Sequence, residues 1–357
     1  MGPVSAPPPT PALERTRTGL CTEPARTRGR DDVTHPDAPA GGTAPIAARI
    51  LETAVARGEQ TAISSFGRSW SYAQLTARAG RMTGALARLE VGPDKRLGLL
   101  LPPVPTAAMA AMAGLRLGAT LVPCDPLARG NGLADRLSGI AAGVLVSLDL
   151  TRLQHRWLDL LDDSALDAVL VDKMAELLPF PRNLMAPLLR GGELATLPRH
   201  PRTGALPRLL QAEGERPGTL DASASAGVLR ADGSRADADQ LADAVDRLLD
   251  LAGGAGRWLI AQHPEDAWAL SALLTPLTAG REVVLLPRLD ARTVAAALDQ
   301  TAPRVAVLSP RVAEALADTP PPSAPLDLAV VPPTVDETLR DRLATAVGAR
   351  VAVWDGP

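Results

Sequence analysis

The 357-residue sequence has few lysines and few aromatic residues, and both shortages limit the functions open to it. Lys95 and Lys173 are its only lysines, so almost all of the positive charge comes from arginine. Aromatic residues make up 2% of the chain, which leaves few rings on which nucleic-acid bases could stack. The formal net charge of −3 provides no broad attraction to nucleic acid either. We therefore expect no nucleic-acid partner.

Cysteine, histidine and long hydrophobic runs are also scarce. Two cysteines far apart in the sequence predict no structural disulfide, which favours a cytoplasmic location. The four histidines are scattered singly and predict no metal site; they are His35, His155, His200 and His263. No apolar run reaches the roughly 18 residues of a transmembrane helix. The first residues also lack the hydrophobic segment of a secretory signal.

What is present divides into four segments. Residues 1–44 are rich in Pro, Ala, Thr, Arg and Gly without periodicity, which predicts a disordered tail. Residues 45–172 are predicted to form a first α/β subdomain, and 219–357 a second one that is truncated. The Pro, Gly and Arg residues of 173–218 interrupt the pattern and predict an irregular connection between the two.

Alternation of strands and helices supports this division. In the first subdomain we predict helices at 46–55, 73–89, 105–117 and 133–140, and strands at 61–64, 96–101, 120–123 and 143–147. In the second we predict helices at 240–251, 267–274, 291–298, 312–317 and 337–347, and strands at 257–261, 282–286, 305–308, 327–331 and 350–354. The strands are short apolar runs of the kind that is buried on both faces of a sheet. The sequence therefore predicts an α/β fold with mainly parallel sheets.

Several segments, in their order and spacing, resemble the adenylate-forming, or AMP-binding, acyl-CoA synthetases. They are Gly67–Leu75, Val91–Pro103, Gly114–Pro126 and Gly280–Asp290. Leu177–Leu188 is similar to long-chain fatty acid–CoA ligases in particular. The resemblance runs from about residue 45 to the end of the chain.

The resemblance implies a fold and a chemistry. It implies the N-terminal domain of these enzymes, with two α/β subdomains and without the mobile C-terminal domain that carries the adenylation lysine. Family members activate a carboxylic acid with ATP and Mg²⁺ and pass it to a thiol. ATP and Mg²⁺ are therefore the expected cofactors if any of this activity remains, and a fatty acyl group is the expected ligand.

The phosphate-binding loop of the family should lie at residues 219–231, and it departs from the family pattern. Members carry a Ser/Thr/Gly-rich loop that ends in Gly-x-Pro-Lys-Gly, in which glycines approach the triphosphate and the lysine neutralises charge. Here the resemblance leaves Ser223, Ser225 and Gly227 as loop residues, and Arg230 stands at the lysine position. We interpret this as a degenerate phosphate loop, and we assign no catalytic residue.

Three further positions depart from the family. After the strand at 257–261, His263 remains from an aromatic–His motif that helps to form the acyl pocket, so it is a candidate pocket residue. Pro332 and Pro333 replace a nucleotide-binding turn, and prolines lack the amide donors that such a turn uses. A metal-handling Glu is expected after about Val353, but the sequence ends at Pro357 before one appears.

Three functions remain open from the sequence. The first is a catalytically impaired homologue, or pseudoenzyme, that acts as a binding or interaction module. The second is residual ATP-dependent activation of a carboxylic acid, completed by a partner chain. The third is a structural partner of an intact paralogue. Peripheral membrane contact is a further candidate, because Leu177–Leu189 is apolar and has Arg182 and Arg190 nearby.

Overall fold

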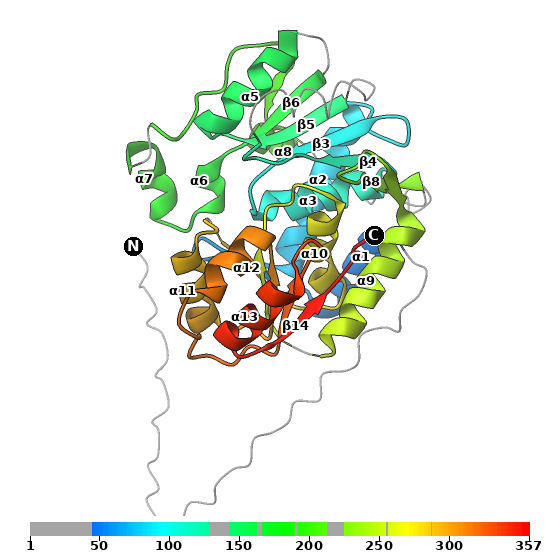
Figure 1. Cartoon of the computed structure of the whole chain (residues 1–357). Coiled ribbons are helices and arrows are strands. Elements are labelled where there is room, and N and C mark those ends of the chain that lie inside the picture. The colour runs from blue at the N-terminus through cyan, green and yellow to red at the C-terminus, as the bar shows by residue number, and fades with distance from the viewer. Residues whose placement is uncertain are drawn as a thin grey trace, which may run out of the picture. The chain divides into compact units, whose positions relative to one another are not determined.

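The computed structural model describes residues 45–128, 143–162, 166–189, 192–212, 225–254, 256–286 and 288–357. These residues build two seven-stranded sheets (Figure 1). The predicted tail 1–44 and the predicted helix 133–140 lie outside the described residues. The predicted α/β class, with mainly parallel sheets, is confirmed.

The first sheet is parallel except at one edge, where β8 and β9 form an antiparallel hairpin. In spatial order its strands are β7 (Thr203–Ala205), β6 (Leu166–Asp172), β5 (Gly143–Leu148), β3 (Arg96–Leu100), β4 (Thr120–Pro123), β8 (Gly227–Leu229) and β9 (Arg235–Asp237). The second sheet is likewise parallel except for the β1–β2 hairpin. Its strands are β14 (Arg350–Val353), β13 (Leu328–Val331), β12 (Val305–Leu308), β10 (Trp258–Ala261), β11 (Val283–Leu285), β1 (Thr61–Ser65) and β2 (Arg68–Ser71).

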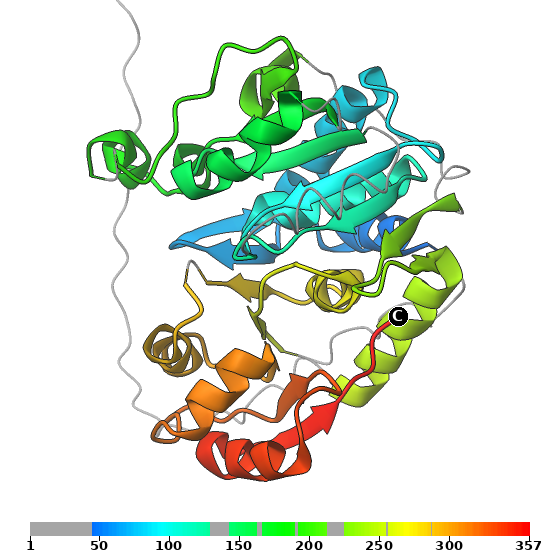
Figure 2. The same cartoon turned by 45° about the horizontal axis from the view of Figure 1, so that its top comes forward.

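Helices fill the space between the sheets and cover their outer faces (Figure 2). Helices α3 (Pro105–Arg116) and α10 (Ala267–Thr278) are buried along their whole length. The other helices are α1 (Ile46–Arg57), α2 (Tyr72–Arg88), α5 (Thr151–Asp162), α6 (Met174–Leu177), α7 (Arg182–Leu189), α8 (Leu206–Ala212), α9 (Ala238–Ala252), α11 (Ala291–Thr301), α12 (Pro310–Ala317) and α13 (Glu337–Val347). One hydrophobic cluster joins residues of both sheets to these central helices. A second cluster packs α11, α12 and α13 against the outer face of the second sheet.

Local sequence signals place several helix starts. Ser71 caps α2 through a reciprocal pair of hydrogen bonds with Gln74, each 3.2 Å long. Asp237 and Gln240 form the same capping box at the start of α9. Such boxes satisfy amide groups that have no partner inside the helix. The short polar turns before these helices therefore fix where each chain segment enters the fold.

The sheets exchange strands across the predicted segment boundaries. β1 and β2 lie within 45–172 but pair in the second sheet, and β8 and β9 lie within 219–357 but pair in the first. Sheet membership therefore does not follow the predicted segments. The described part of 173–218 is also not irregular throughout, because it forms α6, α7, β7 and α8, and β7 pairs with β6. Helix α5 and strand β6 were not predicted either.

Candidate functional site

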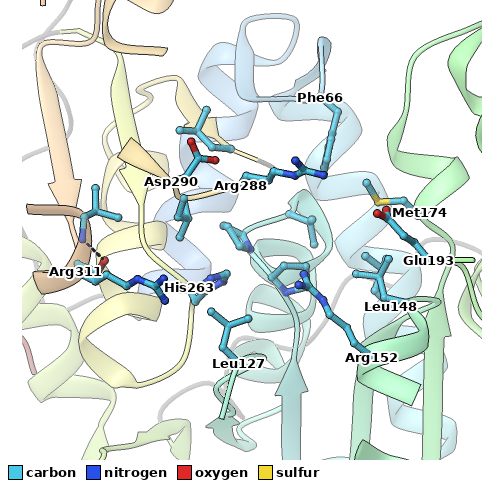
Figure 3. A pocket seen from close by; sticks show the side chains of 18 of the residues that line it. Phe66, Leu127, Leu148, Arg152, Met174, Glu193, His263, Arg288, Asp290 and Arg311 are labelled. Carbon is cyan, nitrogen blue, oxygen red and sulfur yellow. Dashed lines mark hydrogen bonds between the residues drawn. The ribbon is translucent and has the colours of Figure 1, made fainter. Parts of the chain in front are cut away.

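A pocket of about 1000 Å³ opens where the carboxyl ends of strands from both sheets meet (Figure 3). Residues after β3, β5 and β6 line it from the first sheet, and residues after β10, β11 and β12 line it from the second. The region beyond the carboxyl ends of parallel strands is the usual place for ligands in open α/β sheets. The fold therefore puts a ligand-sized space at the position that α/β architecture favours.

Most of the side chains that line this pocket are apolar, and charged groups of both signs lie among them. The apolar side chains include Phe66, Pro102, Val104, Leu148, Met174, Leu286, Leu289 and Val312. Arg152, Arg288 and Arg311 supply cationic groups, and Glu193 and Asp290 supply carboxylates; Asp290 already caps α11 by accepting from Thr293. Figure 3 shows Arg311 on one side of the pocket and Arg152 on the other, near Leu148 and Met174, with His263 between the two arginines. An apolar molecule with one anionic end matches this distribution.

His263, the candidate pocket residue from the sequence, lies in this wall on the segment after β10. Its Nδ1 atom is buried and has no hydrogen-bond partner among the described residues. Burial lowers the pKa of His263; Asp125 opposes that shift, whereas Arg152 and Arg311 add to it. His263 thus contributes a neutral imidazole to the pocket lining, near the two arginines. Its role in binding an acyl group stays a prediction.

Two acidic side chains meet beside His263 from opposite sheets. Glu265 follows β10, and Asp125 follows β4. Burial, followed by the nearby carboxylates of Asp125 and Asp266, raises the pKa of Glu265 to about 7. Asp125 is held in place because its Oδ1 atom accepts from the Leu127 amide at 2.7 Å. The two carboxyl groups therefore bring together segments that follow strands of different sheets.

The predicted phosphate-loop residues lie away from this pocket, at the β8–β9 hairpin. Ser223 lies outside the described residues. Gly227 is buried in β8, where a Cβ atom would lie 2.4 Å from Arg235 Nε and 2.7 Å from the Ala236 carbonyl oxygen. The Ser225 carbonyl accepts from the Arg235 guanidinium. These residues therefore build the edge of a sheet.

Arg230, at the family's lysine position, donates to four acceptors within the protein. Its Nε atom donates to the Pro357 main-chain oxygen at 2.8 Å, and its Nη2 atom donates to Gln240 at 3.2 Å. Its Nη1 atom donates to Ser234 and to the Arg235 carbonyl. The guanidinium therefore joins the hairpin, the start of α9 and the segment after β14.

The segment after β14 packs into the protein. Trp354 stacks at a tilt on Trp268 of α10, with ring centroids 5.4 Å apart. The Trp268 indole N–H donates to the Trp354 carbonyl oxygen at 2.6 Å, and Arg247 donates to the Gly356 carbonyl oxygen at 2.7 Å. Two large rings thus occupy the space between α10 and the end of β14.

The described residues at the hairpin do not fit the triphosphate of ATP. A phosphate cradle needs backbone amides and free cationic donors that face the anion. Here Gly227 lies within a paired strand, and the Arg230 nitrogens already have protein acceptors. Within the described residues, no group of three or more His, Cys, Asp or Glu side chains could hold a metal ion. We therefore derive no step through ATP or Mg²⁺.

Comparisons with known proteins show what the chain is similar to. A family model described as AMP-binding enzyme matches residues 51–182. The two-sheet architecture is that of the N-terminal domain of adenylate-forming enzymes. The resemblance to these enzymes that the motifs predict is thus confirmed.

Individual relatives are similar at low identity. A benzoate CoA ligase from Burkholderia xenovorans superposes with a TM-score of 0.69 at 17% identity, over 87% of this chain and 60% of that chain. A long-chain-fatty-acid-CoA ligase from Archaeoglobus fulgidus superposes with a TM-score of 0.67 at 16% identity, over 89% of this chain and 64% of that chain. In sequence, the long-chain-fatty-acid–CoA ligase of Bacillus subtilis is 26% identical over 140 residues, which is 39% of this chain and 25% of that protein. Surfactin synthase subunit 1 of the same organism is 36% identical over 75 residues, 21% of this chain and 2% of that protein. The chain spans less than two thirds of each of them.

Sequence reasoning found His263 but missed its neighbours. Arg152 lies on α5, a helix that was not predicted, and Arg311 begins α12 in the other half of the chain. Glu265 stands in the polar turn that also holds His263, but Asp125 is distant in the sequence. A search for polar residues just after each predicted strand would have found Asp125 and Glu265. Nothing in the sequence signals the two arginines.

Proposed function

We propose that this protein is a catalytically impaired relative of the acyl-CoA ligases. On this proposal it binds a carboxylic acid with an apolar tail, such as a fatty acid, and works as a binding or interaction module. The cytoplasm is the proposed location. Among the described helices, none is both long and apolar enough to cross a membrane.

The hydrogen bonding of Arg230 carries the proposal of impaired catalysis. Adenylation depends on positioning the phosphates and neutralising their charge. A lysine ammonium at this position would be a mobile point charge, whereas a guanidinium is a planar fork. Arg230 already donates to Pro357, Ser234 and Gln240, and turning it toward a phosphate would break these bonds.

The pocket between the sheets supports the ligand class. Its apolar wall suits an alkyl or aryl chain, and burial of that chain would drive binding. Arg152 and Arg311 line the same pocket as His263, and their guanidinium groups suit a carboxylate. The name of one similar protein, a long-chain-fatty-acid–CoA ligase, agrees with this choice.

Two measurements on the full chain test the proposal. Pyrophosphate–ATP exchange with Mg²⁺ and a fatty acid is expected to stay at the level of a no-protein control. Calorimetric titration is expected to give saturable heat with decanoate and none with ATP–Mg²⁺. Replacing both pocket arginines (Arg152→Ala with Arg311→Ala) should weaken decanoate binding about ten-fold, because charge-assisted contacts are lost.

Arg342→Ala is the matched control, since Arg342 is an exposed arginine on α13 away from the pocket lining. It should bind decanoate like the unmodified protein. Exchange above the control, abolished by Arg230→Ala, would establish residual acid activation instead. Absence of heat with decanoate would exclude the proposed ligand.

A further inference from the structure

Exposed large hydrophobic side chains are concentrated in one short segment. Among the described residues five such side chains are exposed, and three of them fall within residues 180–185, which we call the apolar tip. Phe180 is 78% exposed, Leu184 65% and Met185 43%. Soluble proteins scatter single exposed apolar residues, whereas a cluster marks an interaction site.

The apolar tip is held on a buried anchor. Just before it, Met174 and Leu177 of α6 are buried in the core, directly after strand β6. The Arg68 guanidinium donates to the Glu176 carbonyl oxygen, which ties α6 to the β1–β2 hairpin. Figure 1 shows α7 at the margin of the molecule, beyond α6. Phe180 is thus exposed, although Met174 and Leu177, which precede it in the sequence, are buried.

The first turn of α7 gives the tip a defined shape. The amides of Leu184 and Met185 donate to the Pro181 carbonyl oxygen at 3.1 and 3.3 Å. Leu184 and Met185 therefore project from a helical turn that the chain itself stabilises. A preorganised apolar turn loses little conformational freedom when it docks.

Charges around the tip are mainly positive. Arg182 and Lys173 are exposed, and the Arg182 Nη1 atom lies 3.8 Å from the position of a Cβ built on Gly67. Arg68, at the start of β2, stacks on Trp70, with its Cζ atom 3.9 Å from the ring centroid. Glu176 is the acidic side chain in this stretch. Arg190, noted with Arg182 in the sequence, lies outside the described residues.

We propose that the apolar tip docks on the surface of an anionic lipid bilayer. Phe180, Leu184 and Met185 would enter the boundary between headgroups and acyl chains, and the exposed Arg182 and Lys173 would face lipid phosphates. Charge complementarity selects this partner over an apolar protein surface, which would offer the exposed Arg182 and Lys173 no anionic groups. Met174, at the base of the tip, also lines the pocket, so docking brings the pocket wall toward the bilayer. The proposal stands independently of the proposed function.

Vesicle flotation of the full chain, without any added ligand, tests the proposal. We expect the protein to float with vesicles of phosphatidylcholine mixed with phosphatidylglycerol, and much less with phosphatidylcholine alone. Phe180→Ser and Leu184→Ser together should lower the vesicle partition coefficient by about ten-fold for each residue, because each loses its burial among the lipids. Val55→Ser is the matched control, since Val55 is 89% exposed on α1. It should float like the unmodified protein.

Several outcomes would overturn the proposal. One is equal flotation of the double variant and the unmodified protein, which would assign binding to another surface. Another is the absence of flotation with the anionic vesicles. A third is sedimentation that shows a dimer without lipid and a monomer for the double variant, which would make the tip an interface between copies. Far-UV circular dichroism and thermal unfolding check that the double variant is folded, because exposed positions should change stability little.

Discussion

At the scale of single residues, the buried carboxyl groups of Asp172 and Glu265 have different neighbours. Asp172 is buried at the end of β6, where Arg78 donates to it at 3.1 Å and Thr106 donates to it at 2.5 Å. Burial raises the pKa of Asp172, and Arg78 and Thr106 oppose that shift. Glu265 instead faces another carboxylate, Asp125, and burial raises its pKa to about 7. The first arrangement suits a structural tie, and the second a group that titrates.

The raised pKa of Glu265 predicts a pH effect on stability. Its ordinary value is 4.5, so between about pH 4.5 and 7 the folded protein binds more protons than the unfolded chain. This contribution to stability is therefore present at low pH and is lost as the pH rises through 7. Glu265→Gln should have little effect near pH 5 and should stabilise the protein by about 1–2 kcal/mol near pH 8.

Thermal unfolding of both proteins from about pH 5 to pH 8 measures this difference. Glu314→Gln, at an exposed position on α12, serves as the control and should follow the unmodified protein at every pH. A difference in stability between Glu265→Gln and the unmodified protein that stays constant over this pH range would contradict the prediction.

At the scale of elements, the described residues of the predicted phosphate loop, 225–231, contribute to the β8–β9 hairpin. β8 pairs in parallel with β4 and in antiparallel with β9, so its backbone groups are engaged on both sides. Arg235 reaches across the hairpin to the Ser225 carbonyl and to Thr120. Strand pairing therefore replaces the exposed amides that an anion-binding loop presents.

Gly227→Ala should destabilise the protein by about 1–3 kcal/mol, because overpacking forces neighbouring atoms to move. The new Cβ would lie 2.7 Å from the Ala236 carbonyl oxygen, a backbone atom that moves only if the strand pair shifts. Denaturant unfolding measures the loss. Gly192→Ala is the control and should be close to neutral, since nothing lies within 4 Å of its Cβ position. Equal stability of both variants would mean that the hairpin yields easily at Gly227.

At the scale of the whole molecule, the exchange of hairpins ties the two sheets together. β1 and β2 precede the strands of the first sheet in the sequence but lie at the edge of the second, next to β11. β8 and β9 cross in the opposite direction. Neither sheet is therefore complete without residues from the other half of the sequence, which favours unfolding of the described region as one unit.

Limited proteolysis tests the predicted organisation of the chain. We expect the first cuts within residues 1–44, whose composition predicts disorder, and the next within 173–218. The second expectation follows from the exposed side chains around Phe180 and Leu184. Residues 96–123 should resist, because β3, α3 and β4 are almost entirely buried. Cleavage there before 173–218 would contradict the assignment of a buried sheet.

The sequence by itself determined the class of fold and most of its regular elements. The strands at 120–123, 305–308 and 328–331 are apolar runs, and the helix at 337–347 has a clear cap in Asp336; such signals are local. It also pointed to His263 as a pocket residue. The resemblance to adenylate-forming enzymes came from the same short segments.

Only the tertiary structure decided how these elements pair and what meets in the pocket. Strands of three residues, such as β7 and β8, carry no periodic signal and exist because a neighbouring strand supplies their hydrogen bonds. The pKa of Glu265 depends on Asp125, and the positive charge in the pocket on Arg152 and Arg311, all from distant parts of the chain. The contacts of Arg230 likewise depend on the folded structure, which brings acceptors on Pro357, Ser234 and Gln240 within hydrogen-bond distance of its guanidinium. The sequence determines which chemical group each residue carries. The folded structure determines which groups lie next to it, and these neighbours decide its pKa and its hydrogen bonds.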